Sequence, residues 1–556
     1  MTSRHRRTRW LLLGALTVGF LLQIAVALRA QPYGSDSFHY LLIAKSLASG
    51  DGFVSGGSQH PDETRLPIYP ALIACAYLAM RSLEKAAVFV TAAGGALALV
   101  PIAFFSRALY GRRALGPAVV LGTVSCVIGV SWRLLPEAVY LPLALGSVAC
   151  TWWSARRPSR GRSLLAGTVA GLAAMTRAEG LAWVLFAGGW SFLDGGPARP
   201  RRPGRWARAS LVVLAAGTIY AAYVGWVSVR LGRFDPFPEV RYLRLMREVD
   251  DRFGLRHAPG PRMTWSDRAR FLLTQDQSSF VLESSFASGH MPAPDMTFVV
   301  PDKATYSDSV PIASTARRRF AITTMNLRRV PTALRDMHLV PPVLAVLGLV
   351  GVIAGATTRH GRRRLLFLAA AVAAALLPIV SHVEGRFLFP AFALALFPAA
   401  AGWVWLVAAA RRAWPGSKGP AYVLSVAIAL AVAAAGATHL KAQTARLEEA
   451  AMRRDAAAWA KENLPPGPVL ALEPGIPFWS GHPYRAIPMG GPDAVLAFAR
   501  AQKAAAVSFE DPNDLERLPL LAPFQSDPPP AGFRLLHEVR REGVGSAKLF
   551  AIEPAP

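Results

Sequence analysis

The chain consists mainly of apolar runs long enough to cross a bilayer, separated by short arginine clusters. Hydrophobic residues make up 53% of its 556 positions and charged residues only 17%. A bilayer core of about 30 Å requires about 20 apolar residues in a helix. We predict eleven spans, at 10–28, 86–106, 115–131, 138–154, 163–176, 180–193, 209–228, 338–356, 365–381, 387–410 and 420–438. The expected fold class is therefore an α-helical polytopic membrane protein.

The basic clusters predict the topology. They lie at Arg4–Arg9, Arg107–Arg113, Arg156–Arg162, Arg199–Arg208, Arg359–Arg364 and Arg411–Lys418. The positive-inside rule places each of them in the cytoplasm, so the amino end is expected inside and the carboxyl end outside. The net charge of +26 follows this pattern, which argues against a nucleic-acid partner. The first run is interpreted as a span, because it is longer than a typical signal-peptide core.

One apolar run, Leu66–Met80, does not fit this count. It contains Pro67 and Pro70 and would be only about 22 Å long as a helix. Counting it as a span would place every later arginine cluster outside. We therefore expect a helix in the outer membrane interface, beside a second one at about 36–49. An ordinary tilted span that breaks the charge bias is the alternative.

Ser163–Leu193 is interpreted in the same way, as two short spans joined by the sequence TRAEG. This topology places Arg177 and Glu179 on the outer side. Irregular backbone at membrane depth survives where protein or water satisfies its polar groups, so such a break often borders a water-filled site. A local ion pair between the two residues, without a substrate role, is the alternative.

The predicted domains are a transmembrane domain at 1–439 and an extracytoplasmic α/β domain at 440–556. The first contains a first outer loop at 30–85 and a large, polar, proline-rich outer loop at 230–337. In the second, short apolar runs alternate with helical patterns, which is typical of a small α/β domain. The three cysteines, Cys75, Cys126 and Cys150, lie in apolar runs and are expected to be buried without disulfides.

The chemistry is expected to begin at Asp36 in the sequence YGSDSFHY, where the first span ends. Ser35 is placed to cap the following helix, and Asp36, His39 and Tyr40 would then share one helix face. The helix dipole favours the ionised carboxylate so close to the helix start, which keeps it available as a base. A solvated acid that only stabilises the helix is the alternative.

Glu137, in the sequence WRLLPEAVYLP, is predicted on the same outer side as Asp36. Ionisable groups at membrane depth are costly and usually face a cavity or a partner. Two acids on one side can divide the roles of base, orienting group and metal ligand, so a divalent metal remains an open expectation.

Two arginines supply the complementary charge, Arg65 in DETRLPIYP and Arg386 in SHVEGRFLFP. A guanidinium can hold phosphate oxygens through two parallel donors and would stabilise a phosphate leaving group. Tyr69 and His382 can add hydrogen bonds. Arginines that extend to the membrane interface, with no ligand, are the alternative.

Taken in order, these motifs resemble the GT-C superfamily of integral-membrane glycosyltransferases. The motifs are the outer-loop acid, the arginine before a proline-rich helix, the acid before the fourth span, GLAAMTRAEG and GRFLFPAF. The similarity is strongest to the protein O-mannosyltransferase and lipid A aminoarabinose transferase branch, and it covers about Trp10 to Ala410. It implies that Asp36 is catalytic, that Arg65 binds the carrier phosphate, and that Glu137 and Arg386 match the second acid and the late arginine.

The resemblance also implies inverting transfer from a polyprenyl-phosphate-linked sugar to a lipid, glycan or protein acceptor, at the outer face of a bacterial inner membrane. The sequence departs from the family where Ser37 replaces a second acid and where RLPIYP replaces a Lys-Pro-Pro-Leu element. Three alternatives stay open. They are a flippase for lipid-linked saccharides, an envelope polysaccharide polymerase or ligase, and a noncatalytic scaffold.

Overall fold

A computed structural model describes most of the chain. The described residues are 3–29, 34–54, 65–126, 133–194, 204–231, 234, 327, 342–377, 385–442, 444–487, 491–511, 514 and 519–554. His382 and most of the predicted outer loop at 230–337 lie outside them. Contacts divide the chain into two units. The first comprises Met1–Ala30, Leu66–Gly225 and Ile322–Ala442, and the second comprises Gln31–Arg65, Trp226–Ala321 and Gln443–Pro556.

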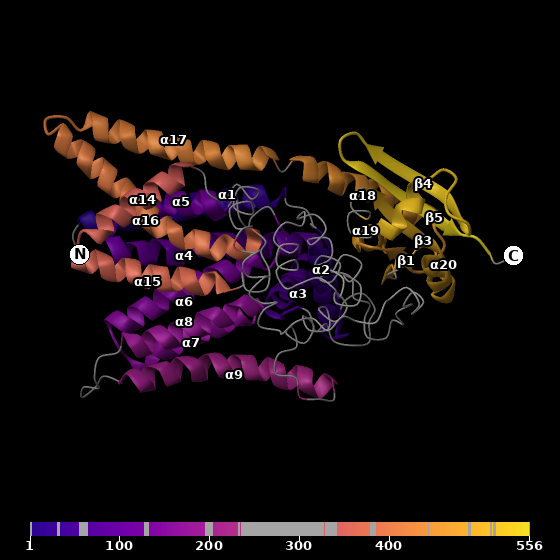
Figure 1. Cartoon of the computed structure of the whole chain (residues 1–556), viewed down its shortest axis with the longest axis horizontal. Coiled ribbons are helices and arrows are strands. Elements are labelled where there is room, and N and C mark those ends of the chain that lie inside the picture. The colour runs from indigo at the N-terminus through magenta and orange to yellow at the C-terminus, as the bar shows by residue number, and fades with distance from the viewer. Residues whose placement is uncertain are drawn as a thin grey trace, which may run out of the picture. The chain divides into compact units, whose positions relative to one another are not determined.

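The first unit is helical, and its long helices run side by side along one direction (Figure 1). Its helices are α1 (Ser3–Ala27), α3 (Ile68–Met80), α4 (Leu83–Tyr110), α5 (Leu115–Cys126), α6 (Glu137–Arg156), α7 (Arg160–Ala174), α8 (Leu181–Leu193), most of α9 (Arg205–Leu231), α14 (Pro342–Ala356), α15 (Arg359–Ala375), α16 (Gly385–Ala413) and α17 (Gly419–Ala442). Each predicted span thus contains a helix. Within the described residues, α4, α6, α9, α16 and α17 are long and apolar enough to cross a membrane. The total of eleven spans stays a prediction.

Local sequence fixes where several of these helices begin. The hydroxyl oxygens of Ser159 and Thr358 accept hydrogen bonds from the backbone N–H groups of Arg162 and Gly361. Each bond satisfies one of the backbone donors that a helix start leaves free. The basic clusters between α6 and α7 and between α14 and α15 therefore coincide with sharply defined helix starts.

The helices pack closely where glycines face backbone. A Cβ added to Gly94 of α4 would lie 2.4 Å from the carbonyl oxygen of Ala138 in α6. A Cβ added to Gly351 of α14 would come similarly close to the carbonyl oxygen of Pro398 in α16. Small residues allow such close helix approach in membrane proteins. The first of these contacts fixes the start of α6, where Glu137 stands.

Large aromatic side chains fill the centre of the first unit. The ring of Phe105 packs edge-on against those of Phe367 and Phe397, at centroid distances of 5.8 and 4.8 Å. Edge-to-face contacts of this kind stabilise a core beyond the area they bury. The cysteines follow the expected burial only in part. Cys126 is buried and Cys150 is half-buried, whereas Cys75 is exposed on α3 because it lies on the side of that helix away from its buried residues.

The second unit combines α2 (Gly34–Ser49) with the carboxyl-terminal residues. The latter form α18 (Thr444–Asn463), β1 (Val469–Ala471), α19 (Gly475–Ser480), β2 (Tyr484–Ala486), α20 (Pro492–Ala501), β3 (Ala506–Asp511), the 3₁₀ helix η7 (Pro519–Gln525), β4 (Phe533–Arg541) and β5 (Gly545–Ile552). The strand order is β2-β1-β3-β5-β4. The first three strands are parallel to one another, and β5 pairs antiparallel with β3 and β4. The small carboxyl-terminal α/β fold predicted from the sequence is present.

One local expectation in this unit is wrong. Helix α2 begins at Gly34, so Ser35 lies inside its first turn and is not the capping residue. Asp36 still falls in the first turn, where the helix dipole favours a carboxylate. The expected electrostatic setting of Asp36 therefore holds without the cap.

Candidate functional site

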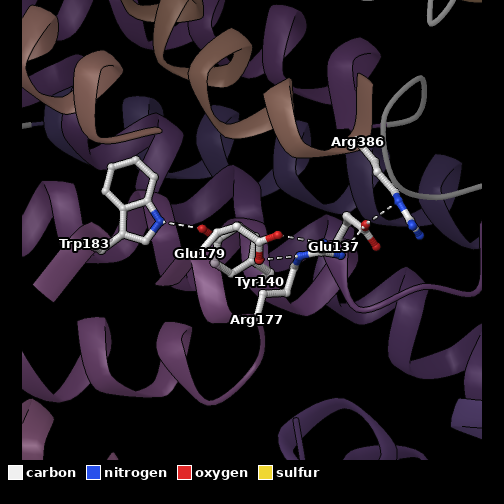
Figure 2. Close-up of polar contacts among 6 residues, drawn as sticks. All are labelled: Glu137, Tyr140, Arg177, Glu179, Trp183 and Arg386. Atoms are coloured by element: carbon white, nitrogen blue, oxygen red, sulfur yellow. Dashed lines mark hydrogen bonds and ion pairs between the residues drawn. The ribbon is translucent and has the colours of Figure 1, made fainter. Parts of the chain in front are cut away.

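The first cluster of charged residues surrounds Glu137, the first residue of α6 (Figure 2). Pro136 precedes it, with a backbone already in the helical region. The Glu137 side chain is buried, and its Oε1 accepts a hydrogen bond from Nη1 of Arg177 at 2.5 Å. Nε of Arg386, in the first turn of α16, lies 3.9 Å from the same oxygen. The structure thus brings together three residues that were predicted separately.

Arg177 links Glu137 to a second acid. It stands in extended backbone just before the short 3₁₀ turn that joins α7 to α8. Its Nε and Nη2 donate to the two carboxylate oxygens of Glu179, each at 3.1 Å. The local ion pair considered from the sequence is therefore real, but it is only half of the arrangement. With three nitrogens bonded to carboxylates, Arg177 acts mainly to hold the two acids in place.

Two residues that were not singled out from the sequence extend this cluster. Tyr140 stands one turn after Glu137 on α6, and its hydroxyl accepts a hydrogen bond from the indole Nε1 of Trp183 at 2.8 Å (Figure 2). Both side chains are buried. The i,i+3 spacing from Glu137 was the available sequence signal for Tyr140. Trp183 carried no such signal, because its contact depends on how α6 and α8 pack.

The second carboxylate oxygen of Glu137 differs from the first in its hydrogen bonding. Oε2 of Glu137 is buried and has no hydrogen-bond partner among the residues that the structure describes. Burying a carboxylate oxygen without a partner is costly, and such oxygens in native structures usually have a specific explanation. The formal charges of Glu137, Glu179, Arg177 and Arg386 cancel. The cluster can therefore accept one more donor, such as a hydroxyl, without gaining charge.

The second cluster, in the other unit, is centred on Asp36. Its Oδ1 accepts a hydrogen bond from Nη2 of Arg65 at 3.1 Å. The guanidinium of Arg65 also lies over the ring of Tyr40, 5.8 Å from its centroid. Asp36 keeps 34% of its side-chain surface exposed, whereas Arg65 keeps 9%. The carboxylate is thus accessible while a cation fixes its position.

The remaining predicted residues occupy different settings. Tyr69 is fully buried, and its hydroxyl shares a hydrogen bond of 3.2 Å with Oγ1 of Thr91. This contact joins α3 to α4. His39 packs edge-on against Tyr484, at 5.9 Å between ring centroids. His382 lies outside the described residues.

One groove lies away from both clusters. An open groove of about 730 Å³ runs along α9 from Trp206 to Leu214, beside Arg160, and it contains none of the predicted residues. Within the part of the chain that the structure describes, no group of three or more His, Cys, Asp or Glu is placed to hold a metal ion.

The first unit contains helices long and apolar enough to cross a membrane, and the second contains a small five-stranded sheet. No protein-family model matches the chain, and no curated protein sequence matches it. Among solved structures, ArnT from Cupriavidus metallidurans bound to undecaprenyl phosphate matches with a TM-score of 0.52 and 15% identity, over 98% of each chain. The resemblance expected from the sequence motifs is confirmed at the level of the fold.

Two archaeal structures are also similar. The Archaeoglobus fulgidus oligosaccharyltransferase in complex with zinc and sulfate has a TM-score of 0.54 at 12% identity, covering 89% of this chain and 68% of its own. AglB from the same organism, in complex with an inhibitory peptide and a dolichol-phosphate, has a TM-score of 0.50 at 13% identity, covering 90% and 69%. These identities establish a shared fold and leave the activity to be argued from the site.

Proposed function

We propose that the protein is a glycosyltransferase that moves a sugar from a polyprenyl-phosphate carrier to an envelope acceptor on the extracytoplasmic face of the membrane. The observation that carries the proposal is the accessible carboxylate of Asp36, held by Arg65 at the start of a helix. A base and a phosphate-binding cation side by side are the two groups such a transfer requires. The similarity of fold to structures that contain undecaprenyl phosphate and dolichol-phosphate supports the same choice of donor.

In the proposed reaction, Asp36 removes the proton from an acceptor hydroxyl. The hydroxyl oxygen attacks the anomeric carbon, and the bond from that carbon to the phosphate oxygen of the carrier breaks. The polyprenyl phosphate leaves with the bonding electrons, and the proton remains on Asp36 until water removes it. Because one displacement occurs at the anomeric carbon, the configuration there inverts. A base in hydrogen-bond reach contributes typically ~10²–10⁴-fold to such a step.

Positive charge close to the leaving phosphate would supply the rest of the acceleration. Arg65 is the first choice, because the hydrogen bond to Asp36 places it beside the base. Arg386, in the first unit, is a second candidate for binding phosphate, because its 3.9 Å approach to Glu137 is longer than a hydrogen bond and can be exchanged for a phosphate oxygen. Arg177 serves as a support, since its nitrogens already hold Glu137 and Glu179. The unsatisfied Oε2 of Glu137 can accept a hydrogen bond from a hydroxyl group.

Two substitutions separate the role of the base from that of the cation. Asp36→Asn keeps an oxygen for Arg65 but cannot act as a base, so turnover should fall by at least ~10²-fold while undecaprenyl phosphate still binds.

Arg65→Ala should weaken undecaprenyl phosphate binding by at least about tenfold, the loss expected for a charge-assisted hydrogen bond. Arg534→Ala, at an exposed position on β4, is the matched control and should bind like the parent protein. Equal carrier affinity in Arg65→Ala and in the parent would refute the assignment of Arg65.

A further inference from the structure

The helix that carries Asp36 is packed against the carboxyl-terminal domain, within one and the same unit. Phe38 of α2 is completely buried. Its ring centroid lies 5.0 Å from that of Trp479, nearly perpendicular to it, and 5.5 Å from that of Phe478. Both partners belong to α19, which follows β1 and precedes β2 along the chain. We call the site formed by Gly475, Phe478 and Trp479 the Phe38 pocket.

Gly475 forms one wall of the Phe38 pocket and lies close to the ring. A Cβ added at this position would lie 3.2 Å from both Cε2 and Cζ of Phe38, and 3.4 Å from Cδ of Arg453. A methyl group at residue 475 would therefore press on the Phe38 ring, which would have to move by a few tenths of an ångström. Interiors are packed densely enough that a single additional methyl group must displace its neighbours.

Ion pairs within the domain hold the wall of the Phe38 pocket in place. Arg453 of α18 is buried and bonds Glu510 of β3 at 2.7 Å, Glu449 one turn earlier on α18 at 2.8 Å, and Glu473 just before α19 at 3.1 Å. It thus fastens three elements around the segment that begins at Gly475. Because breaking a buried pair of this kind is strongly destabilising, the Phe38 pocket is a rigid part of the domain.

Because Phe38 and Asp36 belong to the same helix, fixing the position of Phe38 also fixes the direction in which Asp36 points. Residues in a helix are separated by about 100°, so Asp36 and Phe38 differ by about 200° and lie on nearly opposite sides of α2. With Phe38 held against α19, Asp36 is presented away from the domain, on the same side as Tyr40 and with Arg65 beside both. The edge-on contact between His39 and Tyr484 of β2 opposes rotation of the helix about its axis.

We infer that Phe38 is a positioning residue and that the carboxyl-terminal domain is part of the active unit, because it sets the orientation of the Asp36 carboxylate. This inference rests on the proposed transferase function. It assigns the domain a task that its sequence, which contains no catalytic motif, does not suggest. The domain acts on the reaction through the packing of one aromatic ring.

The close approach of Gly475 and Phe38 gives a specific test in the full-length, detergent-solubilised protein. Phe38→Leu removes the two ring atoms that face residue 475 and leaves a gap. Gly475→Ala places a methyl group against the intact ring. Each single change should lower kcat by about tenfold and alter the KM for the lipid-linked sugar less than about twofold, because small misplacements of a catalytic group act on turnover. In the double variant the methyl group occupies the space that the ring vacates, so most of the kcat should return.

Hydrogen exchange of the peptide 34–49 provides a readout that does not depend on activity. Exchange in α2 should accelerate in each single variant and slow again in the double variant. Phe524→Leu is the matched control, since Phe524 packs against Phe533 and Phe550 in the hydrophobic core of the same domain. It should lower thermal stability while leaving exchange in α2 and kcat unchanged.

Unchanged kcat and unchanged α2 exchange in both single variants would overturn the inference. Additive losses in the double variant would also overturn it, because they would show that the two positions do not share one packing site. A parent protein without any transferase activity would refute the proposed function instead. In that case the exchange measurement would still decide whether α19 holds α2.

Discussion

The position of Glu137 depends on Gly94 in the neighbouring helix α4. The substitution Gly94→Ala therefore tests whether the placement of Glu137 matters for the reaction. A Cβ at residue 94 would lie 2.4 Å from the carbonyl oxygen of Ala138, 2.7 Å from its carbonyl carbon and 3.2 Å from the backbone nitrogen of Val139. All three atoms belong to the backbone of α6, so no side chain can rotate away. Glu137 stands one residue before Ala138 and must move with it.

The size of the effect follows from these distances. Close carbon–oxygen contacts lie at about 3.3–3.6 Å, so α4 and α6 must separate locally by about 1 Å. Overpacking of this kind costs about 1–3 kcal/mol of stability. A displacement of about 1 Å in a catalytic or orienting group can lower the rate by ~10²-fold. We therefore expect both a lower free energy of unfolding and a large loss of transfer.

The assay compares denaturant unfolding and sugar transfer in the detergent-solubilised Gly94→Ala protein with the same measurements on Gly217→Ala. Gly217 lies in α9, and a Cβ there would meet nothing within 4 Å. The control should unfold and react like the parent. If Gly94→Ala also retained the parent's stability and transfer rate, the close contact of α4 and α6 and its role in placing Glu137 would be refuted.

Three further outcomes are expected. Trp183→Phe removes the indole donor to the Tyr140 hydroxyl and should lower the free energy of unfolding by about 0.5–1.5 kcal/mol in denaturant titration; no loss would contradict a contribution from that bond. Burial raises the pKa of Glu510, so the folded state binds this proton more tightly than the unfolded state, and stability should fall as pH rises above the ordinary glutamate pKa of 4.5. Glu510→Gln should flatten the pH dependence of thermal unfolding in that window, and an unchanged slope would exclude Glu510 as its source. Finally, Met80→Cys in a Cys75→Ser background should react with an impermeant thiol reagent added outside, whereas labelling only from the cytoplasm would place α3 on the wrong side of the membrane.

Much of the helical architecture could be predicted because long apolar runs leave few alternatives in a bilayer. Every predicted span contains a helix, and the short run at Leu66–Met80 is helical too. In the carboxyl-terminal domain, short apolar runs in the sequence mark β1, β3 and β5. The strands that carry no clear apolar run, β2 and β4, are the two edges of the sheet. Edge strands are often short or charged, as the three-residue β2 and the arginine-rich β4 are, so their apolar signal is weak.

For the candidate site, the sequence predicted which residues lie on the outer side of the membrane but not which of them contact one another. Charge bias along the chain predicts that Asp36, Arg65, Glu137 and Arg386 share one side of the membrane, but it carries no distances. The bond between Asp36 and Arg65 joins residues 29 positions apart, and the bond between Glu137 and Arg177 joins residues 40 positions apart. Such pairs are decided by how elements pack, which a single sequence does not specify. The attachment of Phe38 to α19 is the extreme case, since over 400 residues separate the two.

The proposed function requires sugar transfer with inversion and requires Asp36 as the base. The most direct measurement incubates purified parent and Asp36→Asn proteins with polyprenyl-phosphate sugars and envelope acceptors, then identifies the products by mass spectrometry and their anomeric configuration by NMR. We expect transfer with inverted configuration by the parent and none by the variant. Transfer by both proteins would remove Asp36 from the reaction. Transfer by neither, together with equal movement of lipid-linked sugars across reconstituted vesicles, would refute the transferase proposal and identify a flippase.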